Sequence, residues 1–126
     1  MNWLLLISGL FGAITTIGHF TMGRKEYLIP MLEASFEEVP KKVMHCVFHY
    51  VSAYLILSTI VLLALGFGVT FSSDSSLLVW FIIIHYAVFA VTQIIIASTS
   101  RIEKVMFKMF QWIFFALIAV FAWLGL

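Results

Sequence analysis

Four histidines are the residues of this sequence best suited to chemistry. His19, His45, His49 and His85 all lie in stretches that contain no Asp, Glu, Lys or Arg. Keeping an ionisable side chain in such an apolar stretch costs free energy, so these positions are the first place to look for function. His45 and His49 are four residues apart, which places both imidazoles on one face of a helix. This spacing allows two histidines to bind one metal ion.

The depth of each histidine follows from its separation from the nearest cationic loop. His19 is five residues from Arg24, or about 7–8 Å along a helix. His45 and His49 lie about 4–5 Å and 10–11 Å from Lys42 by the same count. His85 is sixteen residues from Arg101, or about 24 Å. We therefore expect His19, His45 and His49 to share a layer and form a metal site, with His85 outside it.

Imidazole is a ligand for several cofactors. Neutral imidazole suits Zn, Cu, Fe and Ni, and two histidines on neighbouring helices can hold a haem. The alternatives are a proton or substrate role and hydrogen bonding between helices. Because the His45–His49 pair lacks the Glu of the metalloprotease motif, we assign no catalytic residue and expect a binding role rather than an enzyme.

A second polar group lies further along the chain. Thr92 and Gln93 follow His85 at seven and eight residues, and Gln111 is available from the last apolar stretch. Such residues line a polar cavity or join helices by hydrogen bonds, and we favour helix–helix contacts for His85, Thr92, Gln93 and Gln111.

The composition of the chain is that of a membrane protein. Of 126 residues, 63% are hydrophobic and 10% are charged, and the mean hydropathy is +1.13. Soluble domains are about 45–50% apolar and about 25% charged, so the lipid bilayer is the expected partner. A net charge of +1 without a basic stripe argues against nucleic acid. The single cysteine excludes a disulfide within one chain.

Charged residues divide the sequence into four apolar stretches. Each is near or above the roughly 18–20 residues that span a bilayer as a helix. The stretches lack the alternation of a transmembrane β-barrel. We predict an all-α membrane protein, a single domain 1–126 that forms an antiparallel four-transmembrane-helix bundle. The predicted spans are 3–22, 43–66, 77–98 and 105–124.

The connection between the first two spans is long. Leu28, Leu32, Phe36 and Val39 fall on one helical stripe in this connection, which contains Pro30 and ends near Pro40. We expect a short amphipathic cytoplasmic helix on the membrane surface. An irregular loop is the alternative, and a docking site for a partner is a further one.

Lys and Arg set the expected orientation. All seven lie in the first and third connections, which the positive-inside rule places in the cytoplasm. Both termini are then outside a cytoplasmic (inner) membrane. Trp3, Trp80 and Trp123 are expected at the outer interface and Trp112 at the inner one.

Three functions are consistent with these features. The first is a small multi-pass protein that binds a metal ion or haem through its histidine cluster near the cytoplasmic face. The second is an accessory or assembly subunit of a larger membrane complex, without chemistry of its own. The third is a small transporter or pore formed by a homo-oligomer, because four helices enclose little space alone.

Overall fold

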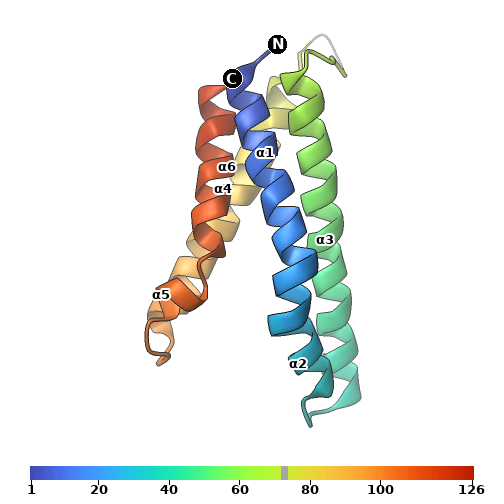
Figure 1. Ribbon diagram of the computed structural model, residues 1–126, viewed down its shortest axis with the longest axis vertical. Helices are drawn as coiled ribbons and strands as arrows, with labels where there is room; N and C mark the ends of the chain where they lie inside the picture. Colours follow the sequence, from blue (N-terminus) through green and yellow to red (C-terminus); the bar gives the residue numbers. More distant parts are fainter. Residues whose placement is uncertain (72–73) are drawn as a thin grey trace.

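Helices form all the regular secondary structure in residues 1–71 and 74–126, which the computed structural model describes. This finding confirms the predicted all-α class. Figure 1 shows both chain ends at one end of the molecule. The elements are α1 (Trp3–Gly18), the π-helix η1 (His19–Leu28), α2 (Ile29–Glu33), α3 (Glu38–Gly66), α4 (Ser76–Thr99), α5 (Val105–Lys108) and α6 (Gln111–Leu124).

Three helical segments are long and apolar enough to cross a membrane. They are Trp3–Glu33, Glu38–Gly66 and Ser76–Thr99, and they indicate a membrane protein. The fourth predicted span differs from expectation, because 105–124 is divided into α5 and the 14-residue apolar helix α6.

The first helical segment is longer than predicted. Trp3–Glu33 is continuous, and only 34–37 connect it to α3. In an α-helix the ring of Pro30 would clash with the carbonyl four residues earlier. Here a π-helix precedes it, and the Ile29 N–H donates to the carbonyl of Arg24, five residues back. The connection is thus largely helical and continues the first helix, while its placement on the membrane surface stays a prediction.

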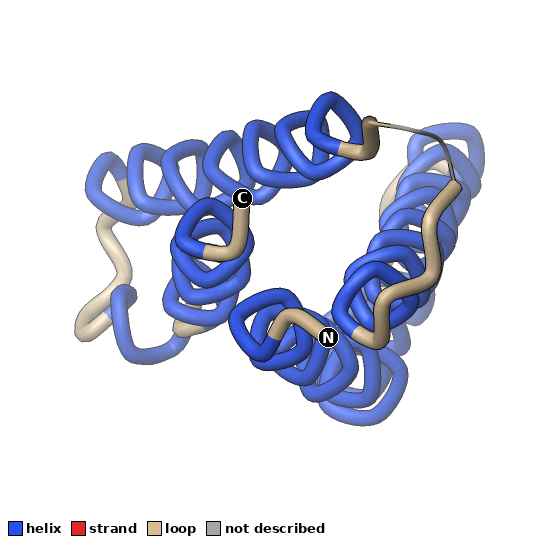
Figure 2. Tube along the Cα trace, turned by 90° about the horizontal axis from the view of Figure 1, so that it is seen from above, coloured by secondary structure: helices blue, strands red, loops and turns tan. Residues whose placement is uncertain are grey.

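Small residues bring α1 close to α3. A Cβ atom added at Gly12 would lie 2.6 Å from Oγ1 of Thr59, and one at Gly9 would lie 2.7 Å from Cδ2 of Leu63. Neither position has room for a larger side chain, so these glycines let the two helices pack closely. Helix α1 also packs against α6, and α6 packs against α4. Figure 2 shows this order of the four long helices from above.

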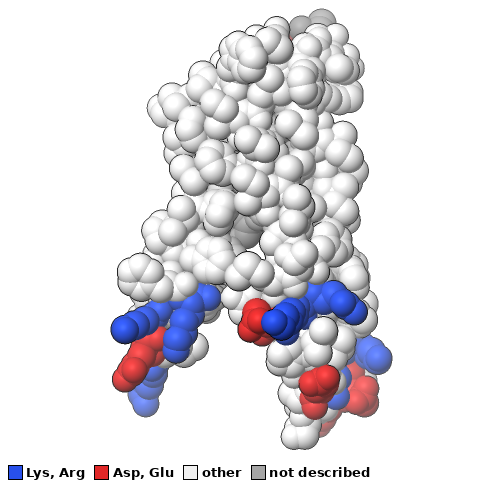
Figure 3. Space-filling model, in the orientation of Figure 1, with Lys and Arg blue, Asp and Glu red and all other residues white. Residues whose placement is uncertain are grey.

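The main core lies in the half of the molecule that contains the chain ends. Tyr86 is fully buried there, and its hydroxyl lies 2.8 Å from Oγ of Ser58, which joins α4 to α3. A second buried hydrogen bond runs from Oγ of Ser8 to the carbonyl of Ile118 and joins α1 to α6. At the other end the molecule separates into two parts, as Figure 3 shows. The buried cluster is Leu5, Leu55, Leu62, Val79, Ile82, Ile83, Tyr86, Ile118, Ala119 and Ala122.

Candidate functional site: a cavity between α1, α3 and α6

A cavity of about 280 Å³ lies between the helices where they begin to separate. This volume is close to the lower limit of roughly 300 Å³ for small-molecule sites. Side chains from α1, η1, α3 and α6 form its walls, with Phe110 at the start of α6. The lining residues are Ile14, Thr15, Gly18, His19, Met22, Gly23, Tyr27, Phe48, Val51, Leu55, Phe110, Gln111, Phe114 and Phe115.

Gly18 leaves part of the cavity open. A Cβ atom added at Gly18 would meet no atom within 4 Å, in contrast to Gly9 and Gly12 at the α1–α3 contact. Space for a side chain therefore exists at this one lining position, and it is unfilled because the residue is glycine.

His19 is the titratable imidazole of the cavity wall, and its hydrogen bonds define its tautomer. Its Nε2 lies 2.8 Å from Oγ of Ser52 and 3.3 Å from the carbonyl of Phe48. The Ser52 hydroxyl already donates to the Phe48 carbonyl, so Nε2 of His19 must be the donor in both contacts. A neutral imidazole then has an unprotonated Nδ1 that accepts a hydrogen bond. A Cβ atom added at Gly23, another lining residue, would lie 3.7 Å from this atom.

Two further polar residues bridge the separated parts of the molecule at the cavity. Nε2 of Gln111 donates to the hydroxyl of Tyr27 over 2.9 Å, and this contact joins α6 to η1. Gln93 of α4 donates to Oε1 of Gln111 over 2.7 Å. The Tyr27 hydroxyl in turn donates to the carbonyl of Lys108. We call this the Tyr27–Gln111–Gln93 chain. It adds the hydrogen-bonding groups of Tyr27 and Gln111 to a wall that is mostly apolar.

The three histidines of the predicted metal site have different surroundings. His45 and His49 are hydrogen-bonded to each other, with their Nε2 atoms 3.1 Å apart. The ring of Phe48 contacts both other histidines: its centroid lies 4.0 Å from that of His19 and 5.6 Å from that of His49. Within residues 1–71 and 74–126, no group of three or more His, Cys, Asp or Glu side chains is arranged to hold a metal ion. The structure thus brings two of the three together and gives His19 other partners.

The second polar group is also divided. Gln93 and Gln111 meet in the Tyr27–Gln111–Gln93 chain, whereas Thr92 is exposed on α4. His85 donates from Nδ1 to the carbonyl of Phe81, and its ring stacks on Tyr54 of α3 at 5.0 Å. His85 is therefore part of an aromatic contact between α3 and α4, away from the cavity.

Tyr27 and Ser52 are site residues that the sequence did not single out. Tyr27 lies in the segment expected to leave the membrane, and Ser52 is one of many serines in apolar stretches. Their importance comes from partners on other helices, which local sequence does not reveal.

Comparison of the chain with models of protein families, with curated proteins and with solved structures found no significant match. The site must therefore be interpreted from its own geometry.

Proposed function

We propose that this chain is a four-span membrane protein whose cavity binds a small apolar molecule carrying one hydrogen-bonding group. The observation that carries the proposal is the cavity of about 280 Å³, because a well-formed apolar pocket with a few convergent polar groups is the usual form of a ligand site.

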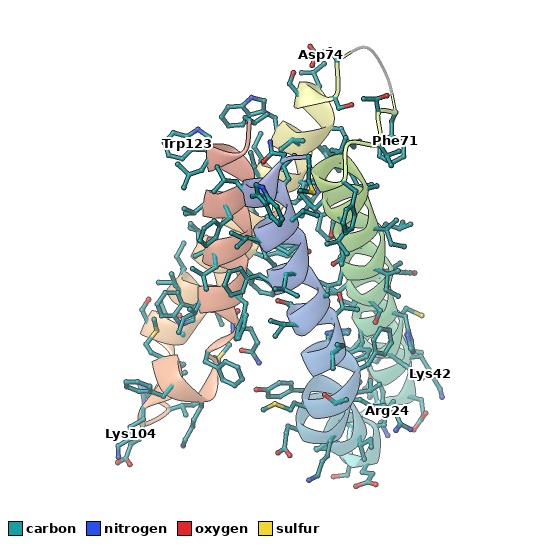
Figure 4. All side chains as sticks on the ribbon, turned by 45° about the horizontal axis from the view of Figure 1, so that its top comes forward. Arg24, Lys42, Phe71, Asp74, Lys104 and Trp123 are labelled. Carbon is teal, nitrogen blue, oxygen red and sulfur yellow. The ribbon has the colours of Figure 1, made fainter. Side chains whose placement is uncertain are left out.

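The distribution of charge supports four antiparallel spans. Figure 4 shows Arg24, Lys42 and Lys104 at one end of the molecule and Phe71, Asp74 and Trp123 at the other. In this arrangement α6 returns the chain to the side where α1 began. By the positive-inside rule the end with Lys and Arg is cytoplasmic, and both termini are outside. Trp3, Trp80 and Trp123 are exposed near the opposite end, as expected for side chains at a membrane interface.

The apolar stretch around α6 is compatible with a fourth span when the residues just before the helix are included. Fourteen helical residues extend over about 21 Å, which is less than the ~30 Å hydrocarbon core. The uncharged residues Met109 and Phe110 extend the apolar stretch before α6 begins. The carbonyl of Met109 accepts a hydrogen bond from Gln93, so this polar group of the irregular segment is satisfied within the protein.

The chemistry of the walls defines the ligand class. Leu55, Phe114 and Phe115 offer an apolar surface, so the body of the ligand is apolar. Nδ1 of His19 is an acceptor, so we expect the ligand to carry a donor such as a hydroxyl group. A molecule of this kind partitions into the bilayer and reaches the protein from there.

Two related probes test this proposal. 2-Naphthol has an apolar body and one hydroxyl group, and naphthalene lacks that hydroxyl. We expect saturable binding of 2-naphthol to the detergent-solubilised protein in equilibrium dialysis, corrected for uptake by empty micelles. One net hydrogen bond of about 0.5–1.5 kcal/mol favours 2-naphthol over naphthalene by up to about tenfold.

The variant Gly18→Leu should abolish this saturable binding, because the new side chain enters the open space at Gly18. Ile17→Phe is the matched control, because Ile17 is exposed on the next position of α1 and its enlargement leaves the cavity unchanged. Equal binding by the Gly18 variant and the wild type would refute the cavity as the binding site.

A further inference from the structure

The His45–His49 pair is separate from the cavity and forms a second chemical feature. Both side chains project from α3, with His49 exposed and His45 half-buried. Their Nε2 atoms approach to 3.1 Å, and their ring planes are inclined by 42°. Two imidazole nitrogens thus lie within hydrogen-bond distance of each other on one side of the helix.

This separation matches the geometry of two imidazoles on one ion. With metal–nitrogen bonds of ~2.0–2.1 Å, the two nitrogens lie about 2.9 Å apart at a square-planar angle and about 3.3 Å apart at a tetrahedral angle. The observed 3.1 Å falls between these values. The separation of the two nitrogens therefore suits an ion bound by both rings, each of which turns its Nε2 lone pair toward the ion.

We propose that His45 and His49 together bind one divalent transition-metal ion, of which Cu²⁺ binds most tightly. Imidazole is a good ligand for Cu²⁺, Ni²⁺ and Zn²⁺, and Cu²⁺ has the highest affinity in this series. The remaining coordination positions are filled by water from the cytoplasmic interface, which lies about 4–5 Å from His45 by residue count. This proposal does not depend on the proposed cavity ligand.

Proton balance is met by a change of tautomer. In the ion-free pair one Nε2 carries a proton and donates a hydrogen bond to the other Nε2. Metal binding needs both Nε2 lone pairs, so the proton of the donor ring moves to its Nδ1 through solvent. Both rings stay neutral and no net proton is released.

The nearby charges on α3 affect affinity. Lys42 lies one turn before His45, and its positive charge opposes a bound cation. Lys41 is paired with Glu38 over 3.1 Å. The charge of Lys42 lowers the affinity of the pair for all divalent ions by the same amount. The preference for Cu²⁺ over Zn²⁺ and Ni²⁺ is therefore retained.

Electron paramagnetic resonance with added Cu²⁺ tests the proposal on tag-free protein in detergent. We expect one bound Cu²⁺ per chain, with hyperfine coupling to the nitrogens of two imidazoles. His45→Gln and His49→Gln should each abolish this signal, whereas His85→Gln and His19→Gln should retain it. Far-UV circular dichroism checks that each variant remains helical.

Three results would overturn the proposal. They are a wild-type spectrum with coupling to fewer than two imidazoles, a signal that survives in both the His45 and His49 variants, and a signal lost in the His19 variant. The first result requires no variant, so the test does not depend on the folding of any substitution. The third would show that His19 is also a ligand, which contradicts a site built from the pair alone.

Discussion

Asn2 forms hydrogen bonds with the ends of three helices. Its Oδ1 accepts hydrogen bonds from the N–H groups of Leu4 and Leu5 and so caps α1. Its Nδ2 donates to the carbonyl of Gly125 over 2.6 Å, and its backbone N–H donates to the carbonyl of Gly66 over 2.7 Å. The ends of α1, α3 and α6 therefore depend on the Asn2 side chain and backbone together.

We predict that Asn2→Ala lowers the free energy of unfolding by about 1–3 kcal/mol, from the lost cap and the lost bond to Gly125. Thermal unfolding followed by circular dichroism in detergent measures the effect. Asn2→Ser is the control, because serine keeps a capping oxygen and lacks the donor, so it should lose less. An alanine variant as stable as the wild type would contradict this role.

His19 illustrates what sequence reveals about a single residue. Its presence in an apolar stretch was apparent from the sequence, and its depth in a membrane stays a prediction. Its partner was not, because Ser52 lies on another helix and the contact depends on how α1 and α3 are rotated against each other. The same rotation gives His19 the Phe48 ring and Ser52 as neighbours, whereas Nε2 of His49 meets Nε2 of His45.

At the scale of the elements, the contact between α1 and α3 depends on small residues. Gly12→Ala would place a Cβ atom 2.6 Å from Oγ1 of Thr59, so one of the two helices or the Thr59 side chain must move. We predict a loss of about 1–3 kcal/mol in the free energy of unfolding. Gly18→Ala is the matched control on the same helix, because its Cβ meets no atom within 4 Å. It should be neutral or stabilising by up to about 1 kcal/mol.

Thermal unfolding of the two alanine variants side by side makes this comparison. If Gly12→Ala were as stable as Gly18→Ala, the close approach of α1 and α3 would not be as described.

The end of η1 is held to α6 by a hydroxyl group. Tyr27 accepts a hydrogen bond from Gln111 and donates one to the carbonyl of Lys108. We predict that Tyr27→Phe increases amide hydrogen exchange across His19–Leu28, because its polar contact with the other part of the molecule is lost. Tyr50→Phe serves as control, because Tyr50 is exposed on α3. Unchanged exchange in η1 would show that apolar packing alone holds this segment.

Element boundaries were less predictable than element cores. The interiors of the first three spans follow from uncharged length. The interruption at 109–110 has neither Gly nor Pro to mark it. It is stabilised by tertiary hydrogen bonds, since Gln93 and Tyr27 donate to the carbonyls of Met109 and Lys108. The π-helix before Pro30 is likewise a local adjustment to proline that hydrophobic periodicity does not show.

At the scale of the whole molecule, the two ends differ in charge and in packing. The end with the chain termini is well packed and carries neither Lys nor Arg, whereas the opposite end carries all of them and is separated into two parts (Figure 3). Charge segregation is a property of the sequence and was predictable from it. The cavity was not, because it arises where helices distant in the sequence diverge.

The proposed cavity site requires α6 to lie in the membrane beside α1 and α3, since residues of all three helices line the cavity. Helix α6 must then be a fourth span. Cysteine labelling from outside intact cells tests it, in a background in which the exposed Cys46 is replaced by serine. The three labelling positions, Ser35, Thr70 and Leu126, are all exposed. We predict that Thr70→Cys and Leu126→Cys are labelled by an impermeant maleimide, and that Ser35→Cys is labelled only after permeabilisation. Labelling of Thr70→Cys with protection of Leu126→Cys would mean that the chain ends on the cytoplasmic side, and would contradict the four-span protein.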